Sequence, residues 1–175
     1  MYLSFPRDTP KDVQIAEAFN QATRISGFIL ALTSLTELVI ANIIADYYSE
    51  NLDKRNKMFY EISENLRLDQ KRRTLMRILT ETSFQNTMAH YPNLNHRLER
   101  LRDLRNRVAH SFPDTSDEFL AKRYSDRVRY VWYKNGQKDS IDLTYVDAES
   151  QIRECSRLFL DMEEIRRKIA RFPSV

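Results

Sequence analysis

The residues best suited to chemistry stand close together in one charged segment, Leu101-Arg102-Asp103-Leu104-Arg105-Asn106-Arg107-Val108-Ala109-His110. Asn106 and His110 are four positions apart, so in a helix they share a face and the amide can orient the imidazole. Arg105 lies roughly 140° around the helix from His110, at about 3.6 residues per turn. An imidazole can move a proton, and a guanidinium can stabilise charge that develops on phosphorus. The segment therefore carries residue types that suit cleavage of a phosphodiester.

This segment resembles the signature of the HEPN family (higher eukaryotes and prokaryotes nucleotide-binding), in which an Arg is followed after four to six residues by a His. Four residues separate Arg105 from His110 here, and Asn106 follows the Arg, as an Asn very often does in the family. Ala109 precedes the His, and a stripe of leucines leads into the segment near the end of a late helix. The resemblance covers roughly residues 25–112.

The resemblance implies a helical bundle, a homodimer whose two motifs face each other, and RNA cleavage without a metal or cofactor. It implies that Arg105 contacts the scissile phosphate, that His110 acts as acid or base, and that Asn106 positions one of them. Many such domains belong to toxin–antitoxin, phage-defence or RNA-processing systems, so an antitoxin or regulatory protein is a candidate partner. One toxin branch carries a modified Tyr two residues after the His. This chain has Phe112 there, which argues against that mode of regulation.

Other interpretations of the same residues remain open. His110 alone fits a histidine that faces the helix dipole at a C-terminus. The chain as a whole also fits a non-catalytic RNA- or nucleotide-binding module, or a helical protein whose arginine-rich face binds an acidic partner. A site built from one helix splays Arg105 and His110 apart, and a two-fold axis would place a second copy of the motif opposite the first. The alternative to that homodimer is a monomeric site completed by Glu37 and the hairpin described below.

Arginines crowd around the motif. Of the 28 Lys and Arg residues 20 are arginine, and the chain carries a formal net charge of +3. Because arginine pairs with phosphate through a planar fork, we expect an RNA-binding surface formed by Arg100, Arg102 and Arg107. The alternative is a solvated helix face partly neutralised by acidic neighbours. We expect the basic run at residues 71–73 to be a solvated face as well.

Glu37 is a lone carboxylate within the apolar run Phe28–Ala45. A buried carboxylate is normally paired, and an arginine of the motif helix is the partner we expect, which would make Glu37 a supporting site residue. A packing salt bridge or simple exposure is the alternative. The run is about long enough to cross a bilayer, but a carboxylate in mid-span is costly in lipid. We therefore predict the central helix of a soluble bundle and no membrane partner.

Aromatic residues alternate with arginines in a second notable segment. Tyr130, Trp132 and Tyr133 would offer unpaired bases a stacking platform, or would simply pack onto the domain as alternate strand residues do. Asn135-Gly136 follows, the strongest short signal for a hairpin. We expect His90 and His96, by contrast, to be surface residues.

The composition favours long helices, because 175 residues contain only 2 Gly and 5 Pro. We predict an all-α fold, a HEPN-like bundle of four to five helices with one β-hairpin at about residues 126–146 before the last helix. We expect residues 1–175 to form a single domain. The single cysteine, Cys155, excludes a disulfide framework and a cysteine zinc site. We expect no metal site and a reducing cytoplasm as the compartment.

Overall fold

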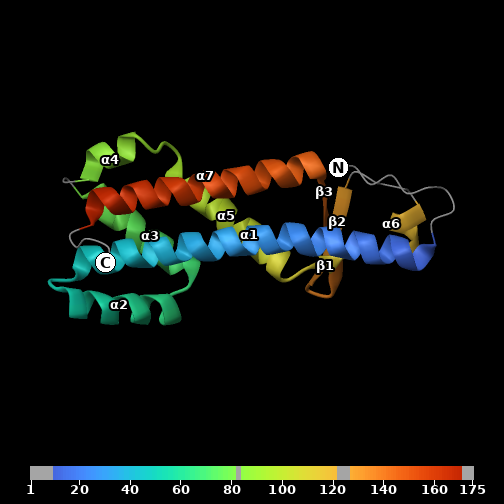
Figure 1. The fold of residues 1–175 in the computed structure, drawn as a ribbon, viewed down its shortest axis with the longest axis horizontal. Helices are drawn as coiled ribbons and strands as arrows, with labels where there is room; N and C mark the ends of the chain where they lie inside the picture. Colours follow the sequence, from blue (N-terminus) through green and yellow to red (C-terminus); the bar gives the residue numbers. More distant parts are fainter. Residues whose placement is uncertain (1–9, 82–83, 122–126, 171–175) are drawn as a thin grey trace. The chain divides into compact units, whose positions relative to one another are not determined.

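The computed structural model describes residues 10–81, 84–121 and 127–170, and these residues are mostly helical (Figure 1). The helices are α1 (Lys11–Tyr48), α2 (Leu52–Asn65), α3 (Leu68–Thr80), α4 (Gln85–Ala89), α5 (Leu94–Ala109), α6 (Asp117–Ala121) and α7 (Tyr145–Ile169). A small antiparallel sheet, formed by β1 (Phe112–Pro113), β2 (Arg127–Lys134) and β3 (Gln137–Thr144), precedes the last helix. The prediction of a mostly helical fold is confirmed, but the described residues form seven helices instead of four to five and include a three-stranded sheet.

The predicted β-hairpin is confirmed as β2 and β3. Lys134 pairs with Gln137, and the two residues between them, Asn135 and Gly136, have φ angles of 52° and 76°. Positive φ at both central residues is the geometry of the tight turn that matches the twist of the two strands. The sequence analysis missed β1, which adds a third strand on the other side of β2. Two residues are too few to show an alternating pattern.

The chain divides into two compact units. The described residues of 1–31 and 104–154 form the first, which we call the sheet unit, and the described residues of 32–103 and 155–175 form the second, which we call the helical unit. The helices α1, α5 and α7 each continue from one unit into the other.

The core of the sheet unit joins the hairpin to the first part of α1. Its buried residues are Ala22, Ile25, Ile29, Val108, Val128, Tyr130, Leu143 and Ala148. The hydroxyl of Tyr130 donates a hydrogen bond to the Ala22 carbonyl at 2.7 Å and accepts one from the Ser26 hydroxyl at 3.1 Å. Burial raises the pKa of Tyr130. Tyr130 is therefore a packing residue, which agrees with the interpretation that the hairpin aromatics pack onto the domain.

The other face of the sheet is organised by Arg129. Its guanidinium makes two hydrogen bonds to the Asp142 carboxylate, at 2.5 and 2.9 Å, and lies over the ring of Phe119 at 4.9 Å from the ring centre. Asp114, which is buried, lies 3.8 Å from the same guanidinium and donates its backbone N–H to the Arg129 carbonyl. These contacts tie β3, the end of β1 and α6 to β2.

The core of the helical unit is built from the apolar stripes of its helices. Leu75, Ile78 and Leu79 of α3 are fully buried, as are residues of α5 and α7, namely Leu94, Leu98, Leu158, Met162 and Ile165. The stretch of α1 from Leu32 to Tyr48 runs through this unit.

Among the residues that the structure describes, one helix, α1, is long and apolar enough to cross a membrane by length and composition. In the described residues, 50% of its most apolar 18-residue window is buried inside the protein. Thr33 and Thr36 are buried within it, and the Thr36 hydroxyl donates a hydrogen bond to the Leu32 carbonyl. The buried side of this helix packs as a core helix does.

Candidate functional site

The predicted motif lies at the C-terminal end of α5, in the sheet unit. His110 donates its backbone N–H to the Asn106 carbonyl at 3.2 Å, so its backbone still belongs to the last turn. The Ser111 hydroxyl then donates to the Val108 carbonyl at 3.2 Å and satisfies one of the carbonyls that the helix end leaves without a partner. Val108 is buried in the core of the unit, so the helix end that carries the motif is held in place from beneath.

The structure brings Arg105 and Asn106 together. One terminal nitrogen of the Arg105 guanidinium donates a hydrogen bond to the amide oxygen of Asn106 at 3.2 Å. Arg105 is half-buried, whereas Asn106 and His110 are exposed. Within the residues that the structure describes, the His110 side chain has no hydrogen bond or ion pair. The site therefore consists of Arg105, which is hydrogen-bonded to Asn106, and the solvent-exposed imidazole of His110 about one turn further along the chain.

The three arginines expected to bind RNA differ in their surroundings. Arg102 is ion-paired with Asp103 at 2.8 Å and with Asp69 at 2.9 Å. Hydrogen bonding to Asp103, with a smaller contribution from Asp69, raises the pKa of Arg102. Arg100 and Arg107 are exposed. Two of the three guanidinium groups are thus open to a ligand, and the third is already occupied by carboxylates.

Glu37 lies in the helical unit, where its carboxylate is 3.5 Å from the Lys71 ammonium group. The Lys71 side chain is 4% exposed and that of Glu37 is 22% exposed. Lys71 also reaches the Ser63 carbonyl at 3.5 Å. The partner is therefore a lysine of α3 where the sequence analysis expected an arginine of the motif helix, and the contact is the packing salt bridge given there as the alternative.

The basic run at residues 71–73 is not the solvated face that the sequence analysis expected. Lys71 and Arg72 are buried, and only Arg73 is exposed. Arg72 is ion-paired with Asp69 at 2.9 Å and with Glu99 at 3.0 Å, and it also donates to the Asn95 side chain. Asp69 lies three residues before Arg72 on the same helix, so the sequence could have indicated that pair. The second partner, Glu99 on α5, lies too far along the chain to be inferred.

Asp69 is ion-paired with three arginines. Besides Arg72 and Arg102, Arg73 approaches it at 2.7 Å. Hydrogen bonding to Arg72, with Arg102 and the charge of Arg73 adding to it, lowers the pKa of Asp69 below its ordinary value. This cluster joins α3 to the middle of α5 and serves the packing of the helical unit.

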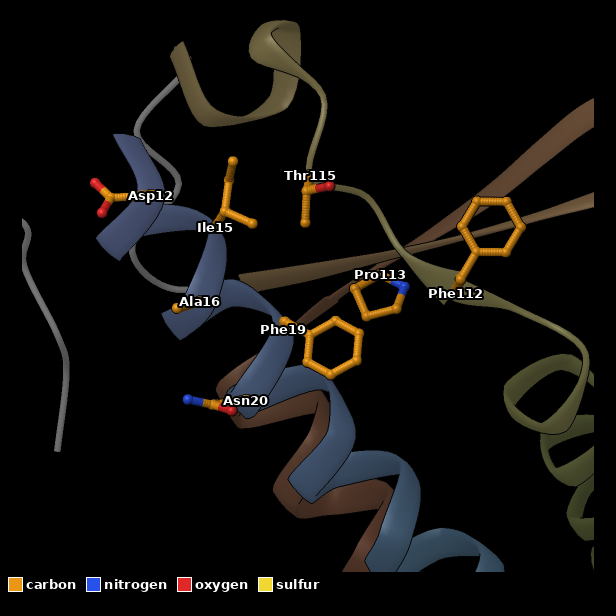
Figure 2. A pocket seen from close by; sticks show the side chains of 8 residues that line it. All are labelled: Asp12, Ile15, Ala16, Phe19, Asn20, Phe112, Pro113 and Thr115. Carbon is orange, nitrogen blue, oxygen red and sulfur yellow. The ribbon is translucent and has the colours of Figure 1, made fainter. Parts of the chain in front are cut away.

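A groove in the sheet unit was missed altogether. The first turns of α1 line one side and the segment around β1 lines the other, with Ile15 and Thr115 facing each other and Phe19 beside Pro113 (Figure 2). Its cavity volume is about 530 Å³. Phe112, which also lines it, is 50% exposed and follows His110 by two residues. The sequence carried no signal for the groove, because its two sides come from segments nearly a hundred residues apart.

Among the described residues, no group of three or more His, Cys, Asp or Glu side chains is placed to hold a metal ion. The predicted surface positions of His90 and His96 are confirmed, because both residues are exposed.

No protein-family model matches the sequence, and neither curated proteins nor solved structures give a match. The case for a function therefore depends on the motif and its geometry.

Proposed function

We propose that this protein is a metal-independent endoribonuclease of the HEPN type, a helical-bundle enzyme that acts in the cytoplasm. The observation that supports the proposal most is the end of α5. There Arg105 donates a hydrogen bond to Asn106, and the imidazole of His110 stands exposed. Cleavage of a phosphodiester uses proton-transfer groups and a positive charge, and this helix end presents one of each.

In the proposed reaction the 2′-hydroxyl of the RNA attacks the adjacent phosphorus. A bond forms between the 2′-oxygen and phosphorus while the bond from phosphorus to the 5′-oxygen breaks, leaving a 2′,3′-cyclic phosphate and a 5′-hydroxyl. One proton leaves the 2′-hydroxyl for a base, and one reaches the departing 5′-oxygen from an acid. His110 performs one of these transfers. Arg105 stabilises the charge that builds up on the phosphate oxygens, and Asn106 holds Arg105 in place.

The proposed working unit is a homodimer formed around the motif helices. The reaction needs both a base and an acid, and each copy of the motif supplies one histidine. A two-fold contact is isologous, so it brings the same surface of two copies together and supplies the second His110. Sedimentation combined with activity over a dilution series tests this point. Specific activity should fall as the dimer dissociates, and a monomer of constant specific activity would contradict it.

The central experiment incubates the purified protein with single-stranded RNA in EDTA. We expect cleavage that EDTA does not inhibit, with cyclic phosphate and 5′-hydroxyl ends on the products. His110→Ala should lower the rate by at least about 10²-fold, the size of a general acid–base contribution.

His96→Ala is the matched control, because His96 is exposed on the same helix and lies outside the motif. It should retain full activity. Equal activity of the His110 and His96 variants would remove His110 from the mechanism and with it the proposed function.

The second candidate is a non-catalytic module that binds RNA or nucleotides, which the exposed guanidinium groups of Arg100 and Arg107 favour. Such a module should show salt-dependent RNA affinity and yield no product. The setting we propose for the enzyme is a toxin–antitoxin, phage-defence or RNA-processing system. An antitoxin or regulatory protein would be the partner in that setting.

A further inference from the structure

The face of the small sheet that points away from α1 exposes an aromatic pair that the proposed chemistry does not use. The register places Phe112 opposite Val131, and Tyr133 lies two residues further along β2, so their side chains share one face. The ring of Phe112 points away from Phe19 (Figure 2). Tyr130, on the other face, packs against α1 in the core. We call the side that carries Phe112 and Tyr133 the aromatic face.

The two aromatic rings hold each other in place and remain open to solvent. They are stacked, with centroids 6.2 Å apart and an angle of 29° between the ring planes, a distance at which aromatic pairs attract. Phe112 is 50% exposed and Tyr133 is 64% exposed. Large apolar side chains that are exposed and grouped together mark interaction sites, and aromatic residues are enriched in the cores of protein interfaces. The pair therefore has the character of an interface anchor.

Two lysines flank the aromatic pair. Lys138 lies directly opposite Tyr133 on β3, and Lys134 follows Tyr133 on β2. The Lys138 side chain is 53% exposed, and its ammonium group is 4.0 Å from Asp114, at the limit of an ion pair. Lys134 is exposed and has no ion pair among the residues that the structure describes. The charge that a ligand meets beside Tyr133 is therefore positive.

The acidic groups of the hairpin are occupied by other contacts. Asp142 accepts two hydrogen bonds from Arg129, and Asp139 accepts one from the Ser140 backbone N–H at 2.8 Å. Residues 127–144 carry four basic and two acidic side chains. A two-fold contact between two copies would place lysines against lysines, and like charges facing each other weaken an interface. Charge thus favours an acidic partner over a second copy.

We propose that the aromatic face binds an acidic segment of a partner protein. An apolar side chain of that segment packs against Phe112 and Tyr133, and its carboxylates meet the two flanking lysines. The aromatic anchors supply most of the affinity, and the charges at the rim orient the partner. Phe112 follows His110 by two residues, which span at most about 7 Å, so the partner lies next to the motif. Its role as a regulator of cleavage rests on the proposed function, whereas the binding itself does not.

The test uses three short, fluorescently labelled peptides in a solution without RNA. In the first peptide, glutamates surround one phenylalanine and one leucine. In the second, lysines replace the glutamates, and in the third, serines replace the two apolar residues. Fluorescence anisotropy gives the affinity of each peptide. We expect the first to bind at least about tenfold more tightly than the others, because it alone matches both the rings and the lysines.

Variants of the aromatic face separate the two contributions. Phe112→Ala and Tyr133→Ala should each weaken binding of the first peptide by about tenfold, the effect of losing an interface anchor. Lys138→Glu keeps both rings and reverses one charge, so it should weaken binding of the first peptide and strengthen binding of the second. The controls are Tyr60→Ala and Lys57→Glu on α2, at an aromatic residue that is 63% exposed and at an exposed lysine. Both controls should leave all three affinities unchanged.

Equal affinities of the three peptides, or no binding of the first, would overturn the proposal even if RNA is cleaved. The expected pattern would support it even if no RNA is cleaved, so the two proposals fail separately. A labelled single-stranded DNA whose affinity falls with Tyr133→Ala as much as that of the first peptide would assign the face to nucleic acid and overturn the proposal. Conversion of a wild-type dimer to a monomer by Tyr133→Ala would make the face a contact between two copies, and the proposal would again be wrong.

Discussion

The arginines of α5 fall into two groups that differ in their surroundings. In the first group, Arg97 is ion-paired with Asp161 at 2.6 Å and Arg102 with Asp69 at 2.9 Å. In the second group, Arg105 contacts the uncharged Asn106, and Arg100 and Arg107 are exposed. Carboxylates compete with phosphate for a guanidinium group, so the first group is committed to packing. The comparison teaches that counting arginines along a helix overstates the surface available to RNA.

The largest contrast should come from Arg105 and Arg97, which lie on the same helix. Arg105→Ala should lower RNA cleavage by about 10²-fold or more through lost charge stabilisation, with little change in the free energy of unfolding. Arg97→Ala should lower the free energy of unfolding by roughly 1–2 kcal/mol, because it leaves Asp161 without its charged partner, and the activity of the folded protein should remain. Initial rates measure the loss of cleavage, and urea denaturation measures the loss of stability. Identical changes in both variants would contradict the division between a site arginine and a packing arginine.

The next contrast lies within α3. Arg72→Met should lower the free energy of unfolding by about 2–3 kcal/mol, because it removes the buried positive charge that pairs with Asp69 and Glu99. The adjacent Arg73→Met should change the free energy of unfolding by less than about 0.5 kcal/mol, since the Arg73 side chain is 73% exposed. Urea denaturation of both variants gives the comparison. A loss at position 73 as large as that at position 72 would show that burial does not separate the two arginines.

A smaller effect should appear in the salt dependence of RNA binding. Arg107→Ala should reduce the slope of log affinity against log salt by about 0.7, the value for one phosphate contact on a single strand. Arg102→Ala should leave the slope nearly unchanged, because Asp69 and Asp103 already neutralise that guanidinium. Titrations at several salt concentrations measure both slopes, and a full reduction by Arg102→Ala would place Arg102 on the RNA.

The smallest effect concerns acid stability. Arg72 lowers the pKa of Asp69 from its ordinary 3.8, so the carboxylate stabilises the folded state above about that pH, and this stabilisation is lost as pH falls through the lower folded value. The difference in the free energy of unfolding between the wild type and Asp69→Asn should therefore be constant near neutral pH and shrink below about pH 4. Urea denaturation across this range measures it. A difference that stays constant down to about pH 2 would contradict the ion-pair interpretation of the cluster.

Much of the fold could be predicted because its signals are local. The apolar stripe ending at Val108 is buried along α5, and Asn135-Gly136 forms the turn of the hairpin. Spacing along a helix or strand places these residues on one face whatever the rest of the chain does.

Less of the site could be predicted. The sequence by itself determined that Asn106 and His110 share a helix face and that Arg105 adjoins them, because all three lie within two turns of one helix. Only the tertiary structure decided that Arg102 meets Asp69, that Arg72 meets Glu99 and that Glu37 meets Lys71. It also decided that Phe19 and Pro113 line one groove. The physical reason is distance along the chain: hydrophobic periodicity states which face of a helix is buried, but the neighbour that a buried or half-buried charge finds depends on how separate helices pack.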